Sequence, residues 1–396
     1  MAKRALVVGL GITGIATAIR LRQTGWEPVL VERAPERRGG GYFIMLFGTG
    51  KAAARRLGAL DAIGTRSGPQ ATSYTVDRDG SRQPAMLPSD LPGEPRMLLR
   101  GDIEQALFSV LPTDVEIHYS TVPTRISQDD SGVQVTLHNT ASDDTRVERF
   151  ELVVGADGMR STVRRLAFGE DFLHPLNFMI GASLLDRPLT GFGLSEGLWL
   201  TEPGRSAIAF SFVDRPSSLL FTYRTDDPDA QFSRAPVDNI RAAFGPEPAG
   251  PILGELFERY EEAPDALFDS VQQVRMPQWH QGRVVLAGDA AWCLTLYSGM
   301  GASTGMAGAD LLGTMLQRHP DDIGTALKAW ETHLRPYIED QQISAMTDRL
   351  LFVAKDEQEH AMRSQMMRMM VSPDPQAANT PTGISFESKN LDIAAP

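Results

Sequence analysis

The chain has 396 residues, of which 42% are hydrophobic, enough to supply the cores of two closely packed domains. A formal net charge of −12 argues against nucleic acid or an anionic membrane surface as a partner. A single cysteine, no leader and no apolar stretch of transmembrane length predict a cytoplasmic protein with no disulfide and no membrane span.

The N-terminus predicts a strand, a glycine turn and a helix. Residues 5–8 form a short apolar run typical of a buried parallel strand, and a helix is expected over residues 14–23. Between them, Gly9 permits the sharp bend, Gly11 lets a pyrophosphate approach the backbone, and Gly14 lets the helix pack on the strand. The helix N-terminus then directs its N–H groups and its dipole at the phosphates.

The next predicted strand, residues 28–31, ends at an acidic residue. Glu32 lies about 20 residues beyond the glycines, where a carboxylate accepts a hydrogen bond from a ribose 2′-OH. An acid here favours FAD or NAD over NADP as the tightly bound nucleotide, and we place the adjacent Arg33 in the same site. A glycine turn in an unrelated α/β protein is the alternative, but the strand, helix and acid in register favour the nucleotide site.

Another strand–turn–helix pattern spans residues 153–164. Its apolar strand delivers Asp157 to a glycine turn, and Ser161 is expected to cap the helix that follows. Arg160 and Arg164 are then available for a phosphate. Taken alone, this pattern is common.

Between residues 176 and 278, short strands joined by Pro- and Gly-containing turns predict an antiparallel sheet. Phe210 and Phe212 share one face of a strand, and Phe221 and Tyr223 share a face of the next. Each aromatic residue alone fits ordinary sheet core, whereas the set fits an aromatic platform for a planar substrate.

A second glycine segment lies far downstream. Residues 283–287 predict a buried strand that leads to Asp289, where a carboxylate is placed to hold sugar or ribityl hydroxyl groups. Gly299, Met300 and Gly301 then lead into a helix whose N-terminus offers positive potential and free N–H groups. That potential suits the anionic edge of a reduced flavin, and a helix start without a ligand is the alternative.

These three segments in this order, with Arg100 between the first two, resemble the class A (single-component) flavoprotein aromatic hydroxylases over about residues 1–335. The resemblance implies that the N-terminal glycines and the acid after the second strand hold the ADP half of FAD, with Arg100 beside the cofactor. It links Asp157 to both FAD and NAD(P)H, and it places Asp289 at the ribityl chain. Residues 299–301 take the position next to the flavin ring.

The reaction implied by the resemblance is an NAD(P)H-consuming hydroxylation. NADPH or NADH reduces a tightly bound FAD, and O₂ then adds to give a C4a-hydroperoxide. The distal oxygen passes to an electron-rich carbon of an aromatic or polyketide-like molecule. Because the flavin carries this chemistry, we expect few catalytic acids or bases and no metal, and both a monomer and a homodimer remain open. Overall length and residues 40–42 look most similar to the tetracycline-modifying monooxygenases, an antibiotic-modifying branch.

The chain departs from the family pattern after Gly-Asp-Ala-Ala. The family has His and then prolines that line the flavin, whereas this chain has Trp292, Thr295 and Leu296. We therefore predict Trp292 and Leu296 in the substrate pocket with the aromatic residues of the sheet. Arg275 leads toward the strand before Asp289 and is expected to face either the flavin pocket or a salt-bridge partner.

Two other functions remain open. A FAD-dependent reductase or dehydrogenase would keep the cofactor without oxygen transfer. The altered surroundings of Trp292 also suit a flavin-containing protein that binds or sequesters a ligand.

The predicted fold class is α/β with α+β elements: a Rossmann-like FAD-binding domain, an inserted antiparallel-sheet substrate domain and a long C-terminal helix. The predicted parts are FAD-binding segments 1–75, 99–175 and 279–325, substrate-domain segments 76–98 and 176–278, a helical segment 326–371 and a disordered tail 372–396. Within the helical segment, Pro336 is expected to break the helix.

Overall fold

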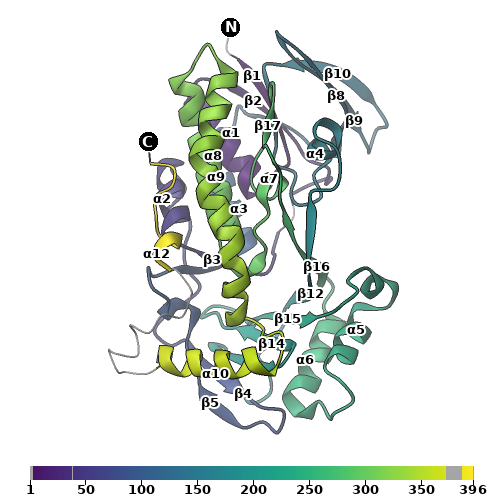
Figure 1. Ribbon diagram of the computed structural model, residues 1–396, viewed down its shortest axis with the longest axis vertical. Helices are drawn as coiled ribbons and strands as arrows, with labels where there is room; N and C mark the ends of the chain where they lie inside the picture. The colour runs from purple at the N-terminus through teal and green to yellow at the C-terminus, as the bar shows by residue number, and fades with distance from the viewer. Residues whose placement is uncertain (1–2, 38, 372–385, 396) are drawn as a thin grey trace.

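Two β-sheets organise the molecule, and helices α8 (Gly301–Arg318) and α9 (Ile323–Asp348) run side by side along the upper one (Figure 1). The computed structural model describes residues 3–37, 39–371 and 386–395. The upper sheet is almost entirely parallel, and the lower sheet is almost entirely antiparallel. This mixed architecture with a long C-terminal helix confirms the predicted fold class.

The parallel sheet brings the three predicted motif strands side by side. Its six strands lie in the order β17 (His280–Gln281), β18 (Val284–Leu286), β11 (Leu152–Gly155), β1 (Arg4–Val8), β2 (Glu27–Val31) and β7 (Glu116–His118). All neighbours pair in parallel except β17 and β18. Strands β1, β11 and β18, which precede the three motifs, are therefore adjacent, so the motifs meet at one edge of the sheet.

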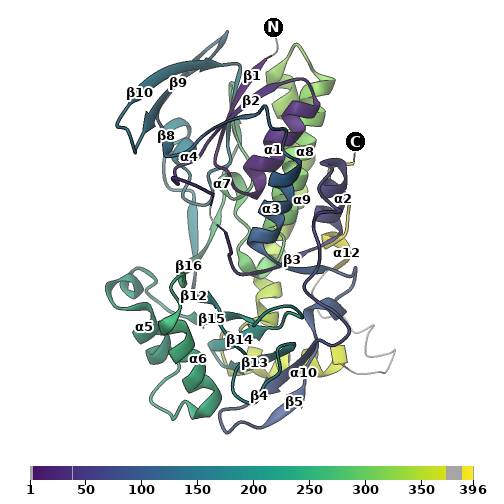
Figure 2. The same cartoon turned by 180° about the vertical axis from the view of Figure 1, so that it is seen from behind.

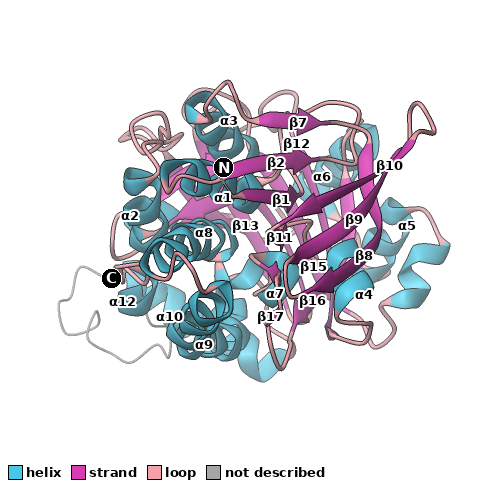
Figure 3. Ribbon diagram, turned by 90° about the horizontal axis from the view of Figure 1, so that it is seen from above, coloured by secondary structure: helices cyan, strands magenta, loops and turns pink. Residues whose placement is uncertain are grey.

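Helices cover one face of the parallel sheet, and a small antiparallel sheet covers the other (Figure 3). The covering elements are α1 (Ile12–Gln23), α3 (Arg100–Val110) and α8 on one side, and β8 (Thr121–Asp129), β9 (Gly132–Asn139) and β10 (Thr145–Phe150) on the other. Burial on both faces explains why the central strands are apolar throughout. Short helices α4 (Thr162–Ala167) and α7 (Asp289–Trp292) follow β11 and β18.

The antiparallel sheet has two faces with different neighbours. Its strands lie in the order β16 (Leu267–Val274), β12 (Leu173–Leu184), β15 (Ser218–Arg224), β14 (Arg205–Phe210), β13 (Glu196–Glu202), β4 (Thr72–Val76) and β5 (Arg82–Pro84). Helices α5 (Pro236–Ala243) and α6 (Gly250–Glu262) pack on one face and close a separate apolar core (Figure 2). The other face packs into the main core, which also contains the parallel sheet. The domain boundaries assigned from the sequence stay predictions.

A two-stranded sheet joins β3 (Phe43–Leu46) to β6 (Arg96–Leu99), and α2 (Gly48–Arg56) follows β3. On the C-terminal side, α10 (Glu357–Val371) lies across the end of α9 (Figure 1). Among the described helices, none combines the length and apolarity that crossing a bilayer requires.

The prediction that Pro336 breaks the C-terminal helix is wrong. Helix α9 continues through Pro336 for 26 residues in all. Trp330, Leu334 and Ile338 are buried along it. Their packing offsets the cost of an interior proline, which is about 3 kcal/mol.

The prediction of a disordered tail is wrong for residues 386–395, whereas residues 372–385 and 396 lie outside the described residues. This segment contains α12 (Phe386–Lys389) and buries the side chains of Phe386 and Lys389. Phe386, Ile393 and Ala394 join the main hydrophobic core, and the Thr49 hydroxyl donates a 2.6 Å hydrogen bond to the Leu391 carbonyl. Polar contacts of this kind leave no apolar periodicity in the sequence.

Candidate active site

Gly9 and Gly14 close the turn after β1 by backbone contacts that exclude a side chain. Gly9 has a φ of +105°, and a Cβ there would lie 2.5 Å from the carbonyl oxygen of Ala156. A Cβ on Gly14 would lie 1.9 Å from the carbonyl oxygen of Gly9. Glycine is therefore required at both positions, and the start of α1 is pressed against the turn.

The N-terminus of α1 is open to an anion. Gly11 is its N-cap, and no side chain caps the helix, so the N–H groups of its first turn lack a side-chain acceptor. Arg100 lies beside this turn, because a Cβ on Gly11 would be 3.3 Å from its Nη2. Glu104 holds that guanidinium at 2.8 Å. The structure thus brings Arg100 to the glycine turn, and its contact with a cofactor stays a prediction.

Glu32 ties the end of β2 to the same turn. Its carboxylate accepts hydrogen bonds of 2.9 Å from the backbone N–H groups of Leu10 and Ala34. The half-buried acid is thereby fixed at the edge of the sheet where a ribose is expected. The neighbouring Arg33 is exposed.

The two distant glycine segments meet at Thr13, a residue that the sequence reasoning missed. A Cβ on Gly288 would lie 2.4 Å from the Thr13 hydroxyl oxygen, and a Cβ on Gly305 of α8 would lie equally close. The first turn of α1 therefore packs directly on glycines of the second segment. Nothing in the sequence marked Thr13, because its partners lie more than 270 positions away.

Asp289 begins α7, at the edge of the sheet where β18 ends. Burial raises the pKa of its carboxyl, while the positive charge of Arg100 and a hydrogen bond with the Cys293 thiol lower it. The residue still exposes surface to solvent, so the carboxylate is accessible and yet closely surrounded by protein. Tyr42 shares these surroundings: burial raises its pKa, Arg100 lowers it and Asp289 raises it again. Cys293 and Tyr42 are further neighbours of the site that the sequence reasoning did not assign.

The turn over residues 299–301 leads into α8 without a side-chain cap. Gly299 has a φ of +65°, and the N-cap of this 18-residue helix is Met300. A Cβ on Gly301 would lie 3.8 Å from Oδ1 of Asp289, so the open helix start and the carboxylate are neighbours. Free N–H groups at such a start attract negative charge.

Asp157 is engaged by its own turn. Its carboxylate accepts hydrogen bonds from the Ser161 hydroxyl at 2.5 Å and from the backbone N–H of Thr162 at 2.6 Å. Ser161 caps α4, as expected, by accepting from the N–H of Arg164. A role for Asp157 toward FAD or NAD(P)H stays a prediction.

The two arginines of this segment are bound to protein groups. Arg160 pairs with Asp269 at 2.5 Å. Arg164 donates to the carbonyl oxygens of Ala290 and Met159, at 2.8 and 2.6 Å. A contact of either guanidinium with a phosphate stays a prediction.

The predicted aromatic platform is wrong for Phe221 and Tyr223. In the sheet register Ala207 lies opposite Phe221, whereas Phe210 belongs to the other face of β14. Phe221 packs against Phe244, Phe257 and Tyr260 of the helix-covered face, and Tyr223 lies in the same core.

Phe210 faces the main core and stacks on Phe43 of β3, with ring centroids 4.0 Å apart and planes inclined by 6°. Phe212 is buried next to the same ring, at a centroid distance of 6.2 Å from Phe43. Trp199 meets Phe210 edge to face at 5.6 Å. Ring contacts thus connect Phe210 with Trp199, with the unassigned Phe43 and, through Phe43, with Phe212.

Trp292 is buried in the core, and its place in the substrate pocket stays a prediction. Its indole is 1% exposed and packs on Trp279 and Trp330, with centroid distances of 4.7 and 5.8 Å. Its Nε1 lies 3.3 Å from the hydroxyl of Thr304 on α8. The indole packs against Gly308 of α8, where a Cβ would lie 2.9 Å from its Cη2.

Leu296 and Arg275 have different surroundings. Leu296 is half-buried in the turn before Gly299, and its place in a substrate pocket stays a prediction. Arg275 is exposed, and its Nε and Nη2 donate to the side-chain oxygen of Gln273 at 3.0 and 2.7 Å. The side chain of Arg275 is therefore hydrogen-bonded to the amide of Gln273, two residues earlier, and not to a carboxylate.

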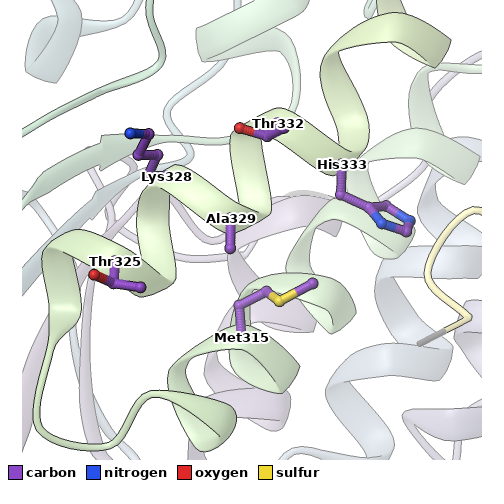
Figure 4. Close-up of a pocket in the computed structure, with 6 residues that line it drawn as sticks. All are labelled: Met315, Thr325, Lys328, Ala329, Thr332 and His333. Carbon is purple, nitrogen blue, oxygen red and sulfur yellow. The ribbon is translucent and has the colours of Figure 1, made fainter.

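A surface hollow between α8 and α9 lies apart from these groups (Figure 4). Its lining residues are Met315, Thr325, Lys328, Ala329, Thr332 and His333. None of them belongs to the predicted site, so the hollow carries no part of the assignment.

Comparisons with known proteins agree with this geometry. A FAD-binding domain family matches residues 3–172. An uncharacterised protein of Mycobacterium tuberculosis (strain ATCC 25618 / H37Rv) is 30% identical over 357 residues, which cover 86% of this chain and 92% of that protein. A flavin-dependent monooxygenase from an unknown prokaryotic organism is 29% identical over 349 residues, covering 86% and 88%.

Among solved structures, the tetracycline destructase Tet(55) superposes with a TM-score of 0.78 at 24% identity, covering 97% of this chain and 98% of that one. This similarity concerns the fold. The sequence relatives and the matched FAD-binding domain show that the chain belongs to the FAD-dependent monooxygenases. The chain is thus an FAD-dependent enzyme, as the sequence predicted.

Proposed function

We propose that this chain uses NADPH or NADH and O₂ to hydroxylate an aromatic or polyketide-like small molecule. The observation that carries the proposal is the meeting of α1 and α8 next to Asp289. Both helices begin at a glycine segment, and neither has a side-chain cap. Two open N-termini with a carboxylate beside them suit a long, polar and anionic cofactor.

The donor set fits FAD from one end to the other. The first turn of α1 and Arg100 would hold the diphosphate, and Glu32 would hold the adenosine ribose. Asp289 would accept hydrogen bonds from ribityl hydroxyls, with the flavin ring beside Gly301. When bound, FAD accepts a hydride from the nicotinamide and activates O₂.

The chain's own contribution is to bind, orient and exclude water. Phe43, Trp199 and Phe210 form an aromatic cluster, which we expect to border the ring of an aromatic substrate. Arg100 places a positive charge near Asp289 and the turn of α1, which favours the anionic cofactor. The overall reaction balances when NAD(P)H, a proton, O₂ and the substrate give NAD(P)⁺, water and a product with one more oxygen atom.

Oxygen dependence separates this proposal from its alternatives. We expect NADPH or NADH oxidation to require O₂ and to yield a product heavier by one oxygen, with phenols and a tetracycline in the substrate panel. Substrate turnover without O₂ would favour a reductase or dehydrogenase. Failure of bound FAD to be reduced with every member of the panel would favour a ligand-binding role.

The variant Asp289→Ala tests the cofactor placement. We expect it to fold but to purify with little FAD, with a Kd for FAD raised about tenfold or more, because charged hydrogen bonds to the ribityl chain are lost. The matched control is Asp322→Ala, which removes an acid that caps the N-terminus of α9. That control should lose about 1 kcal/mol of stability and keep its FAD. Full yellow occupancy in Asp289→Ala, at unchanged affinity, contradicts the placement.

A further inference from the structure

The C-terminal segment, residues 386–395, reaches the turn that precedes α8. The ammonium group of Lys389 donates a hydrogen bond to the carbonyl oxygen of Ser298 and lies 2.7 Å from Oδ2 of Asp348. The side chains of Lys389 and Asp348 are 4% and 2% exposed. A buried ion pair is thus built against the turn next to which we place the flavin ring.

The contact fixes a peptide plane at the start of that turn. The carbonyl of Ser298 accepts from Lys389, and the N–H on the same peptide, that of Gly299, donates to the Leu296 carbonyl at 3.0 Å. The Ser298 hydroxyl then accepts from the N–H of Met300 at 3.1 Å. With both ends of the peptide held, Gly299 keeps its φ of +65° and the open N–H groups of α8 keep their direction.

The segment is anchored on both sides of Lys389, so its position is determined by the fold. Thr49 donates to the carbonyl of Lys389 at 3.0 Å, and the Asn390 side chain accepts from the N–H of Gly48 at 2.9 Å. A Cβ on Gly48 would lie 2.7 Å from that Asn390 oxygen, so α2 is shaped to receive the segment. Asp392 pairs with both terminal nitrogens of Arg56 at 2.7 Å.

We propose that residues 386–395 form part of the flavin site and that Lys389 is a positioning residue, which orients residues 298–301 through the Ser298 carbonyl. This inference rests on the proposed function, because it takes the flavin ring to lie beside that turn. The charge of Lys389 is balanced by Asp348, so its effect is exerted through backbone geometry. Loss of Lys389 frees the peptide to rotate and misdirects the N–H groups that face the ring.

The test uses the full-length holoenzyme with FAD as the probe. Lys389→Met alone leaves the Asp348 carboxylate buried without its partner, which strongly destabilises a fold. The double variant Asp348→Asn/Lys389→Met removes both charges and keeps a folded chain available. The matched control, Asp392→Asn, weakens the same segment at Arg56, at the pair that makes no contact with Ser298.

We expect the double variant to fold, to bind FAD about tenfold or more weakly, and to show a shifted visible absorption spectrum and midpoint potential of the bound flavin. Asp392→Asn should keep the wild-type flavin spectrum and potential. A wild-type spectrum, potential and affinity in the double variant overturns the inference, and so does an equal change in Asp392→Asn. Absence of FAD binding in the wild-type chain instead overturns the proposed function.

Discussion

Replacing Trp292 with phenylalanine tests whether this position belongs to the core or to the flavin pocket. In the structure the indole lies among Trp279 and Trp330, with centroid distances of 4.7 and 5.8 Å, and its Nε1 is 3.3 Å from the Thr304 hydroxyl. We expect Trp292→Phe to lower the free energy of unfolding while leaving FAD affinity and the flavin spectrum unchanged.

The expected loss is about 2–3 kcal/mol. Truncating a buried tryptophan to alanine costs about 3–5 kcal/mol, and phenylalanine retains one ring of that volume. The lost hydrogen bond contributes about 0.5–1.5 kcal/mol, and weakened ring contacts contribute a similar amount for each pair. The Thr304 hydroxyl still donates to the carbonyl of Met300 at 3.0 Å, so no buried polar group is left unpaired.

Gly308 of α8 supplies a compensating variant. A Cβ there would lie 2.9 Å from Cη2 of Trp292, so Gly308→Ala alone should destabilise the protein despite the helix propensity of alanine. In Trp292→Phe that space is open, and the added methyl group should recover about 1 kcal/mol. Urea unfolding of the four proteins in this cycle measures the coupling, and the FAD-to-protein ratio is followed alongside.

Two results would refute the reasoning. Loss of FAD or a shifted flavin spectrum in Trp292→Phe, at an unchanged unfolding midpoint, would place the indole at the flavin. Strict additivity of the two substitutions would show that the methyl group added by Gly308→Ala and the Trp292 ring do not compete for the same space.

The two faces of the antiparallel sheet give a second prediction. In steady-state kinetics, Phe210→Leu should raise the KM for an aromatic substrate, whereas Phe221→Leu should leave that KM unchanged. In urea unfolding, Phe221→Leu should lower the free energy of unfolding by about 1–2 kcal/mol. Equal effects on KM would contradict the register. The third concerns pH: burial alone would raise the pKa of Glu331, but hydrogen bonds from His280 and Arg335 bring it below its ordinary value of 4.5. Because the pKa of Glu331 is lowered in the folded state, its ionised carboxylate stabilises the fold at pH values above 4.5, and this stabilisation is lost as the pH falls through the folded pKa. In Glu331→Gln, the free energy of unfolding should therefore fall less steeply below about pH 4.5 than it does in the wild type.

The cofactor side of the fold was predictable because its signals are local. Gly9 and Gly14 are dictated by contacts within a few residues or with the adjacent strand, and the apolar runs reveal β1 and β18 directly. The position of Arg100 could not be predicted from such local signals. Its approach to Gly11 depends on how α3 packs against α1, and only the family resemblance indicated that Arg100 lies near the cofactor.

The substrate side depends on register between strands, which periodicity within one strand cannot supply. Alternation showed that Phe221 and Tyr223 share a face, and this is correct. It could not show that their face is opposite to that of Phe210, because the pairing of Ala207 with Phe221 is a property of two strands together.

The buried polar contacts that hold the C-terminal segment were the hardest feature to predict from the sequence. Lys389 looks like a solvated charge in the sequence, and its partner Asp348 lies 41 positions earlier. Burial of the pair becomes evident only when the end of α9 and the C-terminal segment meet.

Features that the sequence predicts belong to the expected cofactor site, and features that it does not predict belong to the expected substrate site. Cofactor groups are expected at strand ends and uncapped helix starts, where one residue type is required by backbone geometry. Substrate groups are expected on sheet faces assembled from separate strands, where many side chains are sterically acceptable and register decides which ones meet. The same physical difference explains why the motifs identify FAD chemistry, whereas the substrate must be sought around Phe43, Trp199 and Phe210.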